Sequence, residues 1–194
     1  MQVNFRICNL HLKKDMKNLF VFAALLMSAL SYGQTFTPVD EESKIHFVVK
    51  NFGINTGGDI SGMKGTMKFN AKKPASASFD VTANVSTIDT DNEKRDTHLN
   101  EADYFDTEKY PQIRLVSTQI LPGKDLKNFI FYGKLIIKNI SKNVVFPFTA
   151  ESKKGLAIFK GNFEIIRSDF GIGKSSATLS DKVKVSLTVS AKAG

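Results

Sequence analysis

The chain has 194 residues, of which 42% are hydrophobic and 24% are charged, and its formal net charge is +8. This length fits one domain that can bury a sizeable core. The lysines are scattered and many alternate with apolar residues, so they favour a soluble basic surface over a nucleic-acid-binding face. Weak, transient attraction to anionic membrane surfaces is compatible with this charge.

The first 33 residues have the pattern of a secretory signal. A basic patch (Lys13, Lys14 and Lys17) precedes the apolar run Leu19–Leu30, and small residues follow, so we place cleavage after Gly33. Met16 would be the more typical start, which makes residues 1–15 an over-extended start in this interpretation. The run is shorter than the roughly 20 residues of a membrane span, and an uncleaved anchor is the alternative.

The expected mature chain, residues 34–194, has 161 residues (194 − 33) and no domain boundary. Its charge is +5, because residues 1–33 carry four basic side chains and one acidic side chain out of the total of +8. Cys8 lies in the removed segment, so the mature chain has no disulfide, thiol nucleophile or cysteine metal site. The sequence predicts a protein of the periplasm or a secreted protein.

Eight segments of the mature chain alternate apolar and polar residues with the period of β-strands: 43–50, 63–69, 79–85, 113–117, 129–138, 144–150, 157–165 and 183–191. Glycines at 57–65 indicate a strongly bent strand, and Pro147 indicates a strand edge or a bulge. Short connections favour antiparallel pairing. With no long amphipathic helix to cover a sheet, the strands must close as a barrel or fold as a sandwich.

A dense polar insertion at 89–109 separates the third and fourth predicted strands. Thr90 and Glu93 have the spacing of a capping box, which predicts a short helix over about 91–99 with Asp91 and Arg95 paired along it. A second turn is expected over 101–105. The insertion is where any chemistry would be sought.

Four residues of the insertion are candidates for a metal site or an acid–base set: Asp96, His98, Asp103 and Asp106. Their spacing matches no known zinc pattern, and no serine lies in a nucleophile elbow. A structural role is favoured. In that role Arg95, Asp96 and His98 bond to the backbone and to each other and seal one mouth of the barrel. The loop 168–173, with Arg167 and Asp169, completes this polar cap.

The apolar strand faces are either a packed core or the wall of a cavity, and periodicity does not separate the two. In the cavity interpretation the lumen candidates face inward from most strands: Phe47, Val49, Met67, Phe69, Phe79, Val81, Leu115, Phe131, Leu135, Phe146, Phe148, Phe163, Ile165, Val185 and Leu187.

Three parts of the chain form a longer pattern. The insertion supplies Ser86, Ile88, Asp89, Thr90, Asn92, Arg95, Asp96, His98, Leu99, Asp103, Phe105, Asp106, Tyr110 and Pro111; later parts supply Gly133-Lys134-Leu135 with Ile137 and Val144, then Arg167, Asp169–Gly173, Asp181 and Val183. In this order they resemble the signature of the YceI-like family. Two departures are Asn51, where many relatives have His, and Lys138-Asn139-Ile140, which replaces a more usual Arg-Gly-Val.

The resemblance implies an all-β fold, an eight-stranded antiparallel lipocalin-like barrel with a short helical insertion between strands 3 and 4. It also implies a binding or carrier protein that holds a polyisoprenoid or similar amphiphilic lipid in an apolar lumen. No enzyme activity, metal or nucleic-acid partner is implied, and no cofactor beyond a bound isoprenoid quinone or polyprenyl lipid. The oligomeric state is open, and a dimer is compatible.

Two alternatives to a lipid carrier are kept. The first is an exported enzyme on a hydrophobic substrate with His98 and Asp96 as acid and base, which requires His98 to point into the cavity. The second is an interaction module in envelope stress handling, which requires an exposed apolar patch instead of a cavity.

Overall fold

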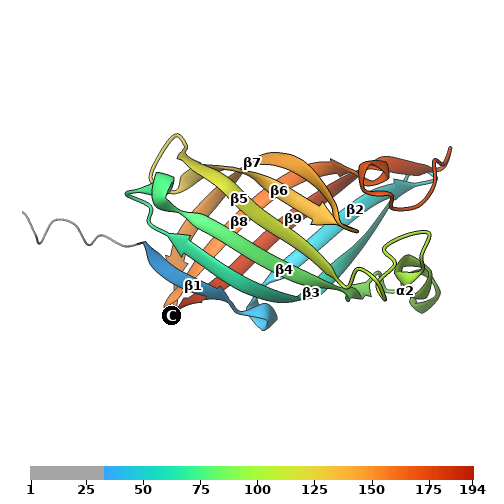
Figure 1. Cartoon of the computed structure of the whole chain (residues 1–194), viewed down its shortest axis with the longest axis horizontal. Coiled ribbons are helices and arrows are strands. Elements are labelled where there is room, and N and C mark those ends of the chain that lie inside the picture. The colour runs from blue at the N-terminus through green and yellow to red at the C-terminus, as the bar shows by residue number, and fades with distance from the viewer. Residues whose placement is uncertain (1–32) are drawn as a thin grey trace, which may run out of the picture. The chain divides into compact units, whose positions relative to one another are not determined.

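Eight antiparallel strands close into a barrel, as predicted, and a ninth short strand extends one end of it (Figure 1). A computed structural model describes residues 33–194; the predicted signal segment, except for Gly33, and Cys8 lie outside them. The strands are β1 (Gln34–Pro38), β2 (Lys44–Asn51), β3 (Ile54–Phe69), β4 (Ser78–Asp89), β5 (Gln112–Pro122), β6 (Asn128–Ile137), β7 (Ile140–Lys153), β8 (Leu156–Ile166) and β9 (Leu179–Ala193). The helix α2 (Glu93–Asn100) lies between β4 and β5, and three 3-10 turns are η2 (Asp40–Glu42), η3 (Pro74–Ser76) and η4 (Arg167–Phe170).

The barrel closes in the order β2-β9-β8-β7-β6-β5-β4-β3, with β3 paired back to β2. Strand β1 was not predicted, because its five residues are short and end in proline. It pairs with the end of β3 at 67–69 and with the end of β9 at 191–193. It therefore continues the sheet beyond the start of β2. No helix in residues 33–194 is long and apolar enough to cross a membrane.

The glycine-rich segment is the interior of one long bent strand, β3. Its register against β4 shifts on both sides of Ser61, and Gly62 has a φ of 73°. The carboxylate of Asp40 in η2 accepts hydrogen bonds from the backbone amides of Gly62 (2.9 Å) and Met63 (2.7 Å). The irregular pairing is a β-bulge, which leaves these two amides without a partner in the β3–β4 pairing. Asp40 supplies that partner and thereby stabilises the bend in β3.

Strands β7 and β8 pair over only half of their length. Residues 148–153 of β7 pair with β8, whereas residues 140–147 pair with β6 alone. Pro147 lies in this free half, in agreement with the strand edge that it predicts. The rings of Phe146 and Phe163 stack at 4.6 Å, so side chains close the barrel where backbone hydrogen bonds do not.

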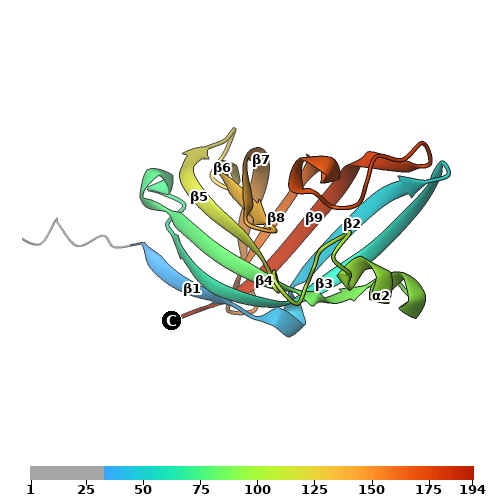
Figure 2. The same cartoon turned by 45° about the vertical axis from the view of Figure 1, so that its right-hand side comes forward.

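Aromatic side chains fill the end of the barrel that β1 extends, which we call the filled end. Phe69 lies at its centre, with ring centroids 5.0 Å from Phe129 and 5.3 Å from Phe159. Phe129 and Phe69 are buried, and Phe36 of β1 packs edge-on against Phe159. The helix α2 and the segment after β8 lie at the opposite end (Figures 1 and 2).

Candidate functional site

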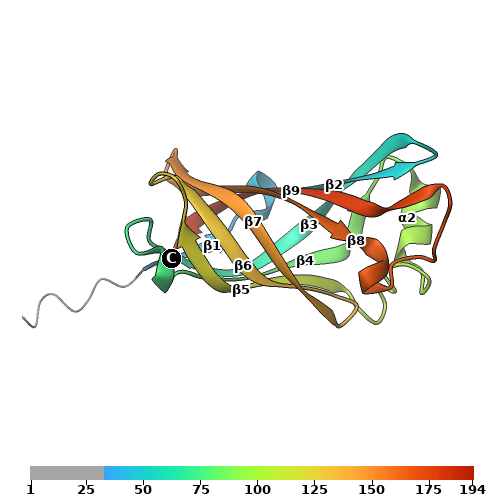
Figure 3. The same ribbon diagram turned by 90° about the horizontal axis from the view of Figure 1, so that it is seen from above.

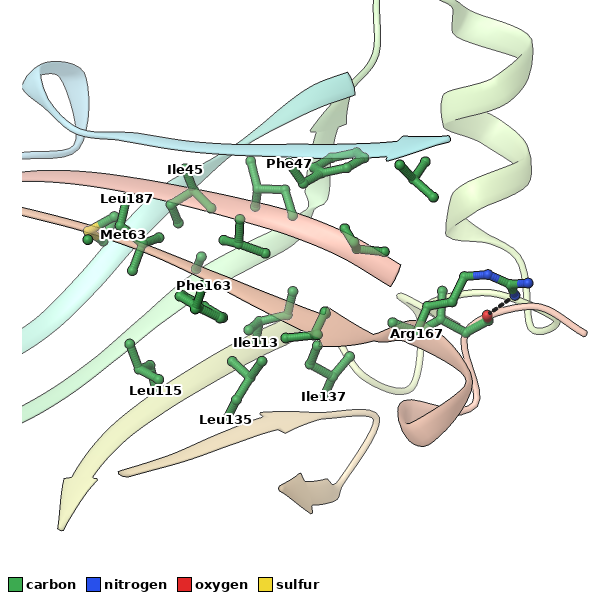
Figure 4. Close-up of a pocket in the computed structure, with 18 of the residues that line it drawn as sticks. Ile45, Phe47, Met63, Ile113, Leu115, Leu135, Ile137, Phe163, Arg167 and Leu187 are labelled. Carbon is green, nitrogen blue, oxygen red and sulfur yellow. Dashed lines mark hydrogen bonds between the residues drawn. The ribbon is translucent and has the colours of Figure 1, made fainter. Parts of the chain in front are cut away.

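A cavity of about 360 Å³ occupies the barrel between the filled end and α2. Figure 4 shows apolar side chains from several strands pointing into one space, with Arg167 at one end. Its wall is mostly aliphatic and includes Ile45, Ile113, Leu115, Leu135, Ile137 and Leu187. Several of these inward-facing side chains keep accessible surface because they face empty space. The interior is therefore hollow in this half, and its volume is within the range of ligand pockets.

The lumen candidates predicted from the sequence line this cavity, with one exception. Phe69 is buried in the filled end instead, because the cavity stops before its position. The prediction missed several wall residues: Ile45, Met63, Ala83, Ile113, Ile137 and Val183. Ile45, Ile113 and Val183 alternate in phase with predicted neighbours, so their strand faces carried the signal that was needed.

Phenylalanines form the floor that divides the cavity from the filled end. Phe79, Phe148 and Phe159 line the cavity and also contact one another, with Phe79 and Phe159 centroids 5.3 Å apart. Each of these three rings also lies against Phe69 on the other side. The depth of the cavity is thus set by large aromatic side chains and not by the end of the barrel.

The opposite end, which we call the mouth, is bordered by the polar insertion. Helix α2, Glu93–Asn100, confirms the short helix predicted over about 91–99, but its cap is Asn92, so the predicted Thr90 cap was wrong. The side chain of Asn92 accepts from the amide of Arg95 at 3.0 Å. The cause is local: Asp91 has a left-handed φ of 58°, and the Thr90 hydroxyl is already bonded to Asp96.

Buried Thr90 links Arg95 and Asp96. The Thr90 amide and hydroxyl donate to one oxygen of Asp96 at 3.0 and 2.5 Å. Arg95 donates from Nε to the Thr90 hydroxyl (2.8 Å) and from a terminal nitrogen to the Thr90 carbonyl (2.6 Å). Arg95 therefore does not form the predicted helical pair with Asp91, and its position against the cavity is fixed by Thr90.

His98 lies at the mouth but is not partnered by Asp96. Its Nδ1 lies 2.8 Å from Glu101, and its ring packs edge-on against Tyr104 at 4.7 Å. Asp103 pairs with Lys174 and Asp106 with Lys109. The four predicted metal or acid–base residues thus face different partners, and within residues 33–194 no three His, Cys, Asp or Glu side chains form a group that could hold a metal ion.

Arg167 organises the loop on the other side of the mouth. It is buried, and its guanidinium donates to the backbone carbonyls of Ile172 (2.8 Å), Lys174 (3.0 Å), Leu179 (3.2 Å) and Ser180 (3.1 Å). It also pairs with Asp181 at 3.0 Å. Asp169 is exposed. The acidic partner of Arg167 is therefore Asp181 and not Asp169, because η4 turns Asp169 outward.

Lys138, which the sequence analysis did not select, ties the mouth together. Its Nζ donates to the carbonyls of Tyr104 (2.6 Å), Gly171 (3.0 Å) and Ala102 (3.2 Å). The amide of Gly173 also donates to the carbonyl of Asp103 at 2.8 Å. The insertion and the loop after β8 are thus held to each other. Lys138 has a left-handed φ of 50°, and the sequence indicated it only as a departure from the family pattern, with no role.

Comparisons with known proteins agree with this architecture. The sequence model of the YceI-like domain matches residues 36–191. Protein YceI of Escherichia coli is 32% identical over 146 residues, which is 73% of each chain. The crystal structure of Burkholderia cenocepacia BcnA has a TM-score of 0.75 and 26% identity, over 79% of this chain and 98% of that one.

A polyisoprenoid-binding domain from Saccharophagus degradans has a TM-score of 0.67 over 83% of this chain and 99% of that one. At 11% identity it is similar in fold alone. The family match covers nearly all of the described barrel, including the insertion and the Arg167 loop. The chain belongs to the YceI-like family.

Proposed function

We propose that this protein binds one amphiphilic lipid, with its apolar chain inside the barrel and its polar end at the mouth. The observation that carries the proposal is the hollow half of an otherwise filled barrel, about 360 Å³ walled by aliphatic side chains. Membership of the YceI-like family and the shared fold of a polyisoprenoid-binding domain support an isoprenoid as the lipid class, such as a quinone or a polyprenyl lipid.

Apolar burial supplies the affinity in this proposal. Each buried CH₂ contributes about 0.8 kcal/mol, so one five-carbon isoprene unit contributes on the order of 3 kcal/mol before ordering costs. A few units therefore suffice for micromolar binding without a charged anchor. The cavity is near the lower end of the usual range of ligand pockets, about 300–1,000 Å³, so a long polyprenyl chain would not fit entirely.

The polar end of the lipid would lie against the mouth. Arg95, His98 and Tyr104 line the cavity there and offer hydrogen-bond donors beside an apolar wall. We assign His98 a role in orienting the ligand, because it lines the cavity beside Arg95 and Tyr104 and its ring is held by Glu101 through Nδ1. The expected signal at 1–33 further supports an exported carrier of the periplasm or the extracellular space.

Native mass spectrometry of the purified protein tests the proposal. We expect a lipid to leave with the protein, or an added prenyl alcohol to bind with one molecule per chain. Val185→Phe should abolish this binding, because Val185 lines the cavity between Phe47 and Phe163 of the neighbouring strands and a third ring there fills the cavity.

Val145→Phe is the matched control, because Val145 is 56% exposed on the same barrel. It should bind lipid as the unmodified protein does. Equal binding by both variants, or no binding of any prenyl lipid by the unmodified protein, would contradict the proposal.

A further inference from the structure

The tip of the β2–β3 hairpin exposes two large apolar side chains. Phe52 is 75% exposed and Ile54 is 71% exposed. The hairpin reaches the end of the barrel that carries α2 and the loop after β8, in all three views (Figures 1, 2 and 3). Nothing in the described residues covers either side chain to any large extent.

The backbone at this tip is strained for the residue that it carries. Phe52 and Gly53 have φ values of 49° and 78°, and they form the two-residue connection between β2 and β3. Such a turn favours Asn-Gly, whereas a bulky side chain rarely adopts positive φ. The amide of Phe52 donates to the carbonyl of Thr178 at 2.9 Å, so the strained turn is held in place. An exposed aromatic ring that is kept in an unfavourable backbone conformation indicates a functional role and not a contribution to folding stability.

The tip borders the mouth of the cavity. Asn51 and Thr56, on either side of the tip in sequence, both line the cavity. Thr178, which holds Phe52, belongs to the loop that Arg167 organises. A surface that covered Phe52 and Ile54 would therefore lie next to the opening.

The surface beside the tip is basic. Lys50, Lys182 and Lys184 are exposed on the outer face of neighbouring strands β2 and β9. Acidic side chains also lie in this region: Glu164 is the cross-strand neighbour of Lys184, Asp181 pairs with Arg167, and Asp59 of the hairpin pairs with Lys44. Within residues 33–194, neither Lys50 nor Lys182 forms an ion pair, so these two lysines supply the positive charge nearest the tip. Residues 34–194 carry a net charge of +5. A basic surface with projecting apolar side chains complements the interface of an anionic bilayer.

We propose that the β2–β3 tip docks the mouth of the barrel onto an anionic lipid bilayer, with Phe52 and Ile54 inserted at the headgroup level and the lysines beside them facing the lipid charges. Two apolar side chains and a few lysines give shallow, reversible attachment. The attachment weakens with salt, because the lysine contribution is screened. Docking needs no lipid inside the barrel, so it is tested separately from the proposed carrier function.

Co-sedimentation with vesicles tests docking. The vesicles contain phosphatidylcholine alone or phosphatidylcholine mixed with phosphatidylglycerol. Residues 33–194 form one compact unit with a complete core, so protein beginning at Gln34 is used beside the full chain, whose apolar run at 19–30 could itself bind lipid. We expect binding to the mixed vesicles, and about tenfold weaker binding for Phe52→Asn or Ile54→Ser.

Phe52→Asn separates docking from a structural role, because Asn suits a positive φ. It should keep or raise the thermal midpoint while it weakens vesicle binding. Leu126→Ser is the matched control: Leu126 is 74% exposed but lies in the β5–β6 connection, at the filled end, and its loss should leave binding unchanged.

Three results would overturn the proposal. They are no binding of the unmodified protein to the mixed vesicles, equal binding by Phe52→Asn, and equal loss by Leu126→Ser. A dimer in solution that Phe52→Asn dissociates, without any vesicle binding, would assign the tip to a second copy of the chain instead.

Discussion

The two ends of the barrel are built from the same strands but have different interiors. At the filled end, Phe36 packs edge-on against Phe159 and Phe69 packs edge-on against Phe129. Phe36, Phe69 and Phe129 do not line the cavity. Toward the mouth the same strands present Ile, Leu and Val, whose smaller side chains do not meet across the lumen. An eight-stranded barrel is just wide enough for side chains to fill it or for one small ligand. Side-chain volume decides between these outcomes along this single barrel.

The difference separates stability from binding. Tight aromatic packing at the filled end stabilises the fold, whereas the aliphatic side chains toward the mouth are loosely packed and leave space for a ligand. The largest expected effect is therefore on stability, at the filled end. Phe129→Ala should lower the free energy of unfolding by about 3–5 kcal/mol, because Phe129 is 1% exposed and a cavity would remain.

Phe47→Ala is the matched change at the hollow end. Phe47 already lines the cavity, so its loss opens no new void and should cost about 1–2 kcal/mol. Urea denaturation of both variants measures the difference. Equal losses would mean that the two ends are packed alike.

The next effect concerns the floor between the ends. Phe79→Ala should deepen the cavity toward Phe69 by the volume of the lost ring, lower stability by about 2–4 kcal/mol, and allow a longer prenyl chain to bind. Native mass spectrometry with prenyl alcohols of increasing length measures the limit before and after the change.

Leu115→Ala controls for a general gain of volume, because Leu115 is in the wall and not in the floor. It should leave the length limit unchanged. If the longest prenyl alcohol that binds is the same in Phe79→Ala as in the unmodified protein, Phe79 does not set the depth of the cavity.

The eight strands and their antiparallel pairing were predicted from the sequence, because alternation survives in every strand of the barrel. The division of the barrel into a filled end and a hollow end could not be predicted, because apolar and polar residues alternate in the same way at both ends. Only the register of the strands brings Phe69, Phe79 and Phe159 to one level of the barrel. Strand β1 was missed for lack of length. The partners of Arg167 were missed because they are backbone carbonyls, which any sequence supplies.

Arg167 gives a third, smaller effect, confined to the mouth. Arg167→Met removes donors from four carbonyls, some of which water can reach, so we expect a loss of about 2–3 kcal/mol. Hydrogen exchange should speed up in the loop 168–180 and not at the filled end. Arg114→Met, an exposed arginine on the outside of β5, should leave exchange in that loop unchanged. Faster exchange throughout the barrel in Arg167→Met would contradict a local role.

The smallest effect lies outside the barrel wall, over the filled end. Asp80 follows Phe79 and accepts two hydrogen bonds from Arg114, at 2.8 and 2.6 Å. These bonds and the charge of the arginine hold the pKa of Asp80 below its ordinary value, and burial opposes them with a smaller effect. A lowered pKa stabilises the fold above the ordinary carboxyl pKa, and this stabilisation disappears as pH falls through the lowered value. Both side chains are about half exposed, so solvent screens the pair and its contribution is small.

Asp80→Asn should therefore lower the thermal midpoint slightly at neutral pH and low salt, with the difference lost in high salt and in strong acid. In strong acid the Asp80 carboxyl is neutral and has nearly the shape of the substituted amide, so the two proteins should then be equally stable. A large loss that persisted in acid would mean that Asp80 supports the packing of Phe79 rather than an ion pair, and the filled end would then depend on its polar exterior as well as on its rings.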